Sequence, residues 1–225
     1  MIQNNKINHI ISWKYLVKEG DILVIIGISA RLVDGVYKVN ESLIEKIKIN
    51  GVIPLVIVPG FDNSRLISMC KGFIIPGGVT WNEIDEEIIK YAIKMDMPLL
   101  GICAGMQALA NIHNFDKDIL SDQTIPIGND SHDSKLKYVH DISITSKFLY
   151  DILGSKKVRV NSRHKFKVTK KNYFSVDAYS DDGLIEAIHL PNKTFILGVQ
   201  WHPEDLDDEF SKKIFACFIE RCKIS

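Results

Sequence analysis

A cysteine between two glycines stands out in PLLGICAGMQALAN, residues 98–111. The apolar run that starts at Pro98 indicates a short buried strand, and the residues from Met106 onward favour a helix. Cys103 is therefore predicted at a strand-to-helix turn, where the N-terminus of the helix directs free N–H groups and its positive dipole end at the thiol. Both effects favour a thiolate, so Cys103 is a candidate nucleophile in a glycine-flanked elbow. The alternative is a buried core cysteine with two incidental glycines.

A histidine and an acid follow a late apolar run in GVQWHPED, residues 198–205. If this run is a strand of the same sheet, its end delivers His202 to the edge where Cys103 lies, and Glu204 can accept the second imidazole N–H. Pro203 restricts the backbone between them. The pattern indicates a Cys-His-Glu triad. Taken singly, His202 can instead be a surface residue, and Glu204 a charge at the start of a last helix.

A double glycine ends another apolar run in IIPGGVTW, residues 74–81. Paired glycines after a strand let backbone N–H groups turn toward a ligand. Together with the N–H of Ala104, the N–H of Gly78 can form an oxyanion hole for a tetrahedral intermediate. A plain turn is the alternative when the two glycines are considered alone.

The elements that must position these groups alternate between strand and helix through the first half of the chain. Continuous apolar strands of this kind favour a parallel sheet with helices on both faces. Polar and turn-forming residues from 115 to 135 indicate an excursion over the surface. From residue 173, three strand-like runs separated by Asp182-Gly183 and Pro191-Asn192 predict an antiparallel addition. The expected strands are 22–28, 53–58, 72–75 and 98–102, and the expected helices are 41–48, 83–94, 106–112 and 207–222.

Composition narrows the class of protein. The 225 residues are 46% hydrophobic, and 28 basic residues balance 28 acidic ones. We therefore expect one globular domain over residues 1–225, with no electrostatic reason for a nucleic-acid or membrane partner. No apolar block of signal or membrane-spanning length occurs near the N-terminus, which predicts a cytoplasmic protein. We assign no role to residues 1–20.

Read in order, the motifs PGG, GICAGMQ and GVQWHPE resemble the class I glutamine amidotransferase-like superfamily, a flavodoxin-like fold. The stretches GISAR, VNSRHK and DGLIEAIHLPNKTFILGVQWHPE resemble, within it, the γ-glutamyl-γ-aminobutyrate hydrolase family, peptidase family C26. The resemblance implies hydrolysis of a small γ-glutamyl amide to glutamate and an amine, through a γ-glutamyl thioester and without a cofactor. It implies Cys103, His202 and Glu204 as triad. The implied substrate contacts are Gly77, Gln107, Asn161, Ser162, Arg163 and His164.

One departure concerns Arg163 and Lys165, which stand where many relatives have other residues after the VNS tripeptide. Their charges predict a preference for an anionic substrate, and a solvated basic loop is the alternative. The same motifs are compatible with two other functions. The chain can be a glutaminase that supplies ammonia to a separate synthetase, or a non-catalytic binding protein, and either can work as a homodimer.

We expect no metal site, because the sequence has no C-x-x-C or H-x-x-x-H pair. Four other histidines lack a cysteine or acid partner at motif spacing. We therefore predict structural or surface roles for His113, His132, His140 and His189.

Overall fold

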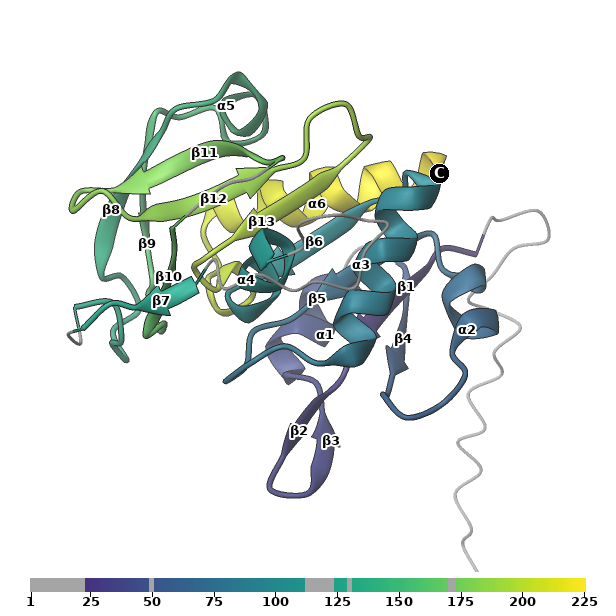
Figure 1. The fold of residues 1–225 in the computed structure, drawn as a ribbon. Coiled ribbons are helices and arrows are strands. Elements are labelled where there is room, and N and C mark those ends of the chain that lie inside the picture. Colours follow the sequence, from purple (N-terminus) through teal and green to yellow (C-terminus); the bar gives the residue numbers. More distant parts are fainter. Residues whose placement is uncertain (1–22, 49–50, 112–123, 129–130, 170–172) are drawn as a thin grey trace, which may run out of the picture.

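The computed structural model describes residues 23–48, 51–111, 124–128, 131–169 and 173–225, so residues 1–20 and His113 lie outside its description. Its main feature is a nine-stranded sheet with the order β4-β1-β5-β6-β13-β12-β11-β8-β9 (Figure 1). The first five strands in this order run parallel, as the alternating pattern predicts. They are β4 (Ile53–Ile57), β1 (Ile25–Ser29), β5 (Gly72–Ile75), β6 (Leu99–Ile102) and β13 (Ile196–Val199).

Two apolar cores sandwich this sheet, because successive side chains of a strand point to opposite faces. In β5, for example, Ile74 packs into one core, and Phe73 and Ile75 pack into the other. The first core is closed by α1 (Glu41–Lys48), α5 (Lys147–Leu153) and α6 (Glu209–Ile224). The second is closed by α2 (Ser64–Met69), α3 (Glu83–Met95) and α4 (Ala104–Asn111).

The start of α3 shows why the sequence places a helix there. Asn82 accepts a hydrogen bond from the backbone of Asp85, and the Asp85 carboxylate accepts one from the backbone of Asn82, which completes a capping box. Acidic residues in the first turn and Lys94 in the last complement the helix dipole. The predicted helix 83–94 therefore begins at the expected residue.

The antiparallel half is larger than the sequence pattern predicted. The three late strands are present as β11 (Ser175–Ser180), β12 (Ile185–His189) and β13. The sheet continues through β8 (His140–Ile144) and β9 (Lys157–Val160), which the sequence analysis did not identify. Two short ribbons accompany the sheet: β7 (Thr124–Pro126) with β10 (Phe166–Val168), and β2 (Arg31–Val33) with β3 (Val36–Lys38).

Three neighbouring strands bring the sequence motifs to one edge. β5, β6 and β13 lie side by side and parallel, with Phe73 opposite Leu99 and Ile102 opposite Val199. Parallel neighbours end at the same edge of a sheet, so the residues that follow them meet there. The three segments are Pro76-Gly77-Gly78, Cys103-Ala104 and the residues from Gln200 to Glu204.

Candidate active site

Cys103 occupies the single residue between β6 and α4. Its φ of 50° lies in the left-handed region, which is costly for a residue with a side chain. Its N–H donates to the carbonyl of Val199 at 2.8 Å, and its carbonyl accepts from the N–H of Gln107 at 3.0 Å. Sheet and helix thus fix both sides of the peptide, and the predicted elbow is present.

The two glycines around Cys103 allow the elbow to pack. A Cβ at Gly105 would overlap the carbonyl oxygen of Ile75 on the neighbouring strand, and a Cβ at Gly101 would lie 2.8 Å from the Gly105 backbone. Backbone occupies the space of both side chains, so neither position can accept even alanine without movement of the main chain. The spacing G-x-C-x-G is therefore a packing requirement.

His202 follows β13 and lies beside the elbow. Its Nδ1 is 2.7 Å from Oε1 of the buried Glu204, which belongs to a short 3-10 turn, Pro203–Asp205. The side chain of Asn161 holds the His202 backbone from the other side, since it accepts from the N–H and donates to the carbonyl, each at 2.8 Å. These contacts fix the ring with Nε2 free to serve Cys103.

Electrostatics favour a charged His202. Burial opposes the charge, but hydrogen bonds to Cys103 and Glu204 and the negative charges of both outweigh it and raise the pKa of His202 to about 10. Burial raises the pKa of Cys70 to about 11 and also raises the pKa values of Cys217 and Cys222, which favours the neutral thiol at all three. The raised pKa of His202 favours an imidazolium beside Cys103.

The double glycine after β5 lies against the histidine. A Cβ at Gly77 would lie 2.5 Å from Cε1 of His202, so the missing side chain makes room for the ring. Gly78 packs in the same way against Arg31, whose Cδ would be 2.8 Å from a Cβ there. The segment Gly77-Gly78 therefore approaches the histidine on one side and an arginine on the other.

Arg31 is a site residue that sequence reasoning did not single out. Its NH1 forms an ion pair with both oxygens of Asp85 at 2.9 and 2.8 Å, and Asp85 is fully buried. Its NH2 and Nε donate to the carbonyls of Pro76 and Gly77 at 2.5 and 3.2 Å. The guanidinium thus anchors the glycine turn, and the sequence signal for it was the GISAR stretch, residues 27–31, to which the sequence analysis gave no role in the site.

A pocket of about 590 Å³ opens over these groups. Cys103 and His202 lie in its wall together with the double glycine and part of the β2–β3 hairpin. The other predicted contacts in the wall are Gln107, Arg163 and His164. The remaining lining residues are Arg31, Val33, Lys38, Val39, Asn40, Pro76, Val79, Lys165 and Phe166. The nucleophile and the base candidate thus share a cavity within the size range of small-molecule sites.

Comparison with known proteins decides the family. The sequence model of peptidase C26 matches residues 79–204, which include the elbow and the histidine motif. The chain is also 31% identical over 211 residues to "Putative glutamine amidotransferase PB2B2.05" of Schizosaccharomyces pombe, with 82% of each chain covered. The chain belongs to the peptidase C26 family.

Other relatives place this C26 member among glutamine amidotransferases. "Putative glutamine amidotransferase-like protein RP404" of Rickettsia prowazekii is 25% identical over 252 residues, with 83% of this chain and 90% of the relative covered. The glutaminase domain of Trypanosoma brucei CTPS with bound acivicin has a TM-score of 0.66 at 17% identity, over 88% of this chain and 93% of that one. The fold is the class I glutamine amidotransferase fold, and the family is one of amide hydrolases.

Two of the predicted substrate contacts of this C26 member lie outside the pocket. Asn161 and Ser162 are fully buried and do not line the pocket. Asn161 supports the backbone of His202, and the hydroxyl of Ser162 donates to the carbonyl of His132 at 2.7 Å. Their side chains form hydrogen bonds within the protein. Asn161 and Ser162 therefore position the site, whereas the sequence analysis expected them to bind substrate.

The charges predicted to bind an anion already have partners. NH1 of Arg163 lies 2.6 Å from Oδ2 of Asp205, and Nζ of Lys165 lies 3.2 Å from Oδ2 of Asp133. Both residues line the pocket, but each already forms an ion pair with an aspartate. These ion pairs weaken the argument for an anionic substrate. Gln107 is also engaged, because its amide donates to the carbonyl of Phe166 and to Gln200, each at 3.3 Å.

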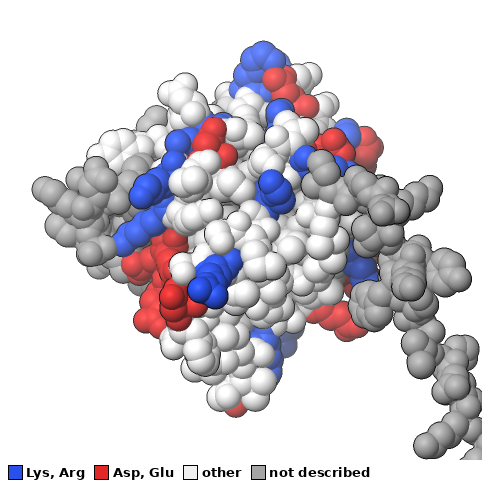
Figure 2. Space-filling model, turned by 90° about the vertical axis from the view of Figure 1, so that its right-hand side faces the viewer, with Lys and Arg blue, Asp and Glu red and all other residues white. Residues whose placement is uncertain are grey.

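On the face seen in Figure 2, charged side chains do not point to a macromolecular partner. In the view of Figure 2, basic and acidic side chains are mixed and separated by uncharged surface, in line with equal totals of 28 each. Among the described residues, no helix combines the length and apolar character needed to cross a membrane.

Proposed function

We propose that this protein is a cysteine hydrolase that cleaves the amide bond of a small γ-glutamyl compound. The observation that carries the proposal is the meeting of Cys103, His202 and Glu204 at the ends of two adjacent strands. The strained elbow, the 2.7 Å contact between His202 and Glu204 and the raised pKa of His202 support it. Membership of an amide hydrolase family supports the reaction class.

In the proposed mechanism, Sγ of Cys103 attacks the γ-carbonyl carbon of the substrate. The N–H groups of Gly78 and Ala104 stabilise the oxyanion, because Ala104 begins α4 and its N–H has no partner within the helix. His202 donates its proton to the departing amine nitrogen, and a γ-glutamyl thioester remains. His202 then takes a proton from water, whose oxygen attacks the thioester and releases glutamate.

The direct test is glutamate release from a panel of γ-glutamyl amides, with hydroxylamine added to trap the acyl group as a hydroxamate. Wild type should form the hydroxamate, and a Cys103→Ala variant should not. Cys70→Ala is the matched control, because Cys70 is a buried cysteine outside the pocket wall. A folded Cys103→Ala variant that still released glutamate would refute the proposed nucleophile.

The second candidate is a glutaminase that supplies ammonia to a synthetase. It is favoured by relatives named as glutamine-hydrolyzing GMP synthase and CTP synthase proteins. Values of kcat/KM for glutamine and for γ-glutamyl amides with larger amines separate the two functions. A clear preference for glutamine would favour the glutaminase, and a preference for a larger amide would favour the hydrolase. Loss of the hydroxamate product with every substrate would favour a binding protein.

A further inference from the structure

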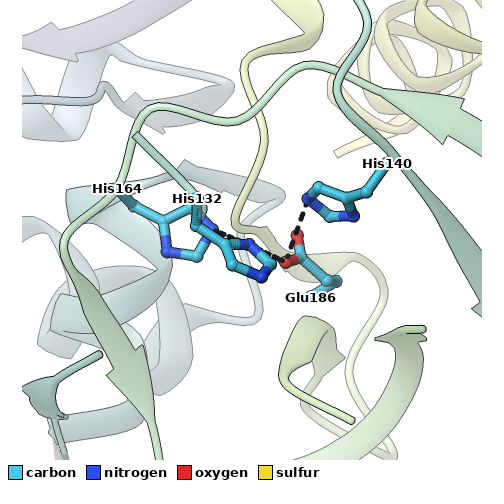
Figure 3. A group of neighbouring side chains, drawn as sticks. All are labelled: His132, His140, His164 and Glu186. Atoms are coloured by element: carbon cyan, nitrogen blue, oxygen red, sulfur yellow. Dashed lines mark hydrogen bonds and ion pairs between the residues drawn. The ribbon is translucent and has the colours of Figure 1, made fainter. Parts of the chain in front are cut away.

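Four side chains from four separate segments converge in one cluster (Figure 3), and one of them, His164, also lies in the pocket wall. His140 lies on β8 and Glu186 on β12, while His132 and His164 lie on the loops before β8 and after β9. His132 and His164 are 3% exposed and Glu186 is fully buried, whereas the His140 side chain is 15% exposed. One nitrogen of each ring and one carboxylate oxygen lie within 4.8 Å of one another.

Four of the six distances between ligand atoms in this histidine–glutamate cluster are close to the edges of a coordination tetrahedron, and all six are within 4.8 Å. The Nδ1 of His132 is 3.2 Å from Nε2 of His164, and each of these atoms is 3.5 Å from Oε1 of Glu186. The Nε2 of His140 is 3.7 Å from the same oxygen. Ligands at zinc distances of about 2.0–2.1 Å are about 3.3–3.4 Å apart in a tetrahedron. A small movement of His140 would complete the set.

The outward nitrogens of the three rings show where their protons lie. His132 Nε2 is 3.0 Å from Oδ2 of Asp182, and His164 Nδ1 is 2.9 Å from the carbonyl oxygen of Phe166. His140 Nδ1 faces the carbonyl oxygen of Asp141 at 3.4 Å. These oxygens only accept hydrogen bonds, so each outward nitrogen carries the hydrogen. In the neutral rings, all three inward nitrogens therefore present lone pairs to the cluster.

Glu186 adds a negative charge to those lone pairs. Neither of its carboxylate oxygens receives a hydrogen bond from any residue that the structure describes, and neither does the inward Nε2 of His140. A buried carboxylate without a donor is costly, and three nitrogen lone pairs around it add to the cost. A cation at the centre would satisfy all four groups at once.

We propose that His132, His140, His164 and Glu186 form a structural zinc site. Three imidazoles and one carboxylate suit Zn²⁺ better than Mg²⁺ or Ca²⁺, which take oxygen ligands. Four protein ligands leave no open position, which is the arrangement of structural sites. The outward hydrogen bonds to Asp182 and to two carbonyls are the contacts that orient metal-binding histidines.

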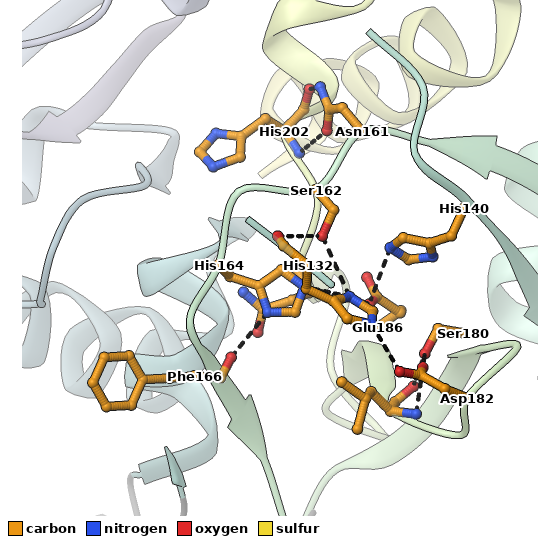
Figure 4. Close-up of polar contacts among 12 residues, drawn as sticks. His132, His140, Asn161, Ser162, His164, Phe166, Ser180, Asp182, Glu186 and His202 are labelled. Atoms are coloured by element: carbon orange, nitrogen blue, oxygen red, sulfur yellow. Dashed lines mark hydrogen bonds and ion pairs between the residues drawn. The ribbon is translucent and has the colours of Figure 1, made fainter. Parts of the chain in front are cut away.

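The site would stabilise the segment that holds the catalytic histidine candidate. Asn161, Ser162 and His164 are nearly consecutive, and Figure 4 shows Asn161 and Ser162 between His202 and the cluster. Asn161 binds the backbone of His202, Ser162 binds the backbone of His132, and His164 is a ligand. A metal ion bound by His164 and His132 would thus hold the end of this short segment that lies farther from His202.

The sequence analysis expected no metal because it searched for ligands at short spacing. The nearest two of the four ligands are eight residues apart, and Glu186 is 22 residues beyond His164. A second proton on His132 would bridge the same lone pairs, because the charged ring can donate to Glu186, an interaction that raises the pKa of His132 in spite of burial. The test must therefore distinguish a metal from a protonated cluster.

The experiment measures metal content and does not depend on activity. Untagged protein is expressed with zinc, passed through a desalting column and analysed by mass spectrometry of its elements. We expect about one zinc per chain, as for a closed site. After removal of the metal, titration with Co²⁺ should give the visible spectrum of tetrahedral cobalt.

Variants locate the metal. Asp182→Asn, at a half-exposed side chain that orients His132, should weaken Co²⁺ binding by about 10–100-fold without unfolding the protein. Glu186→Gln should abolish binding. His189→Gln is the matched control, because His189 pairs with Asp177 at 2.7 Å outside the cluster and should leave binding unchanged.

Zinc bound at the thiol of Cys103 would be lost in a Cys103→Ser variant. Zinc bound at the histidine–glutamate cluster should remain in that variant. Folded wild-type protein that carries no zinc and gives no cobalt spectrum would overturn the proposal in favour of a protonated cluster. Loss of the metal in Cys103→Ser together with full binding in Asp182→Asn would also overturn it.

Discussion

Replacement of Gly77 by alanine tests whether the missing side chain sets the position of His202. The new Cβ would lie 2.5 Å from Cε1 of the ring, whereas carbon atoms in favourable contact are about 3.5–4.0 Å apart. The two groups must therefore separate by about 1 Å. Neither backbone can retreat easily, because Arg31 binds the carbonyl of Gly77 and Asn161 binds the backbone of His202 with two hydrogen bonds.

The imidazole itself must then turn, at the expense of its 2.7 Å contact with Glu204 or of its alignment with Cys103. A displacement of about 1 Å in a catalytic group costs about 100-fold in rate, which corresponds to about 2.7 kcal/mol of transition-state stabilisation. We expect Gly77→Ala to lower kcat/KM for a chromogenic γ-glutamyl anilide by about that factor.

Gly27→Ala is the matched control. A Cβ there would lie 2.8 Å from the ring of Phe73 and 3.0 Å from Sγ of Cys70, so the core is overpacked to a similar degree away from His202. It should cost about 1–3 kcal/mol of stability and leave kcat/KM of the folded protein near wild type. A folded Gly77→Ala variant with kcat/KM within about threefold of wild type would refute the reasoning.

Three further changes probe the site. Cys103→Ala should reduce glutamate release by several orders of magnitude while the circular dichroism spectrum stays native, and near-normal turnover would exclude the triad. Glu204→Gln removes a negative charge that raises the pKa of His202, so that pKa should fall and the alkaline limb of the kcat/KM profile should move to lower pH by about 1–3 pH units; an unchanged limb would contradict the pairing. Asp85→Asn leaves Arg31 buried without its counter-charge and should cost about 3–5 kcal/mol in urea unfolding, a loss that a merely solvated pair would not show.

The local sequence pattern was sufficient to predict the parallel core of the sheet and the motifs at its edge. A helix cap such as Asn82-x-x-Asp85 and a continuous apolar run such as Phe73-Ile74-Ile75 carry their structural signal within a few residues. The elbow at Cys103 was predictable for the same reason. The β2–β3 hairpin carried a signal that was overlooked: Asp34-Gly35 has positive φ at both residues, 53° and 74°, as a tight hairpin turn requires.

The sequence by itself therefore determined the strand ends from which Cys103, the double glycine and His202 project. It also determined that parallel strands would bring those ends to one edge. Only the tertiary structure decided what surrounds them. The ion pair of Arg31 with Asp85 joins residues 54 apart, and the histidine–glutamate cluster joins four segments between residues 132 and 186. Such contacts depend on which strands become neighbours and on where loops return, and no local periodicity records either.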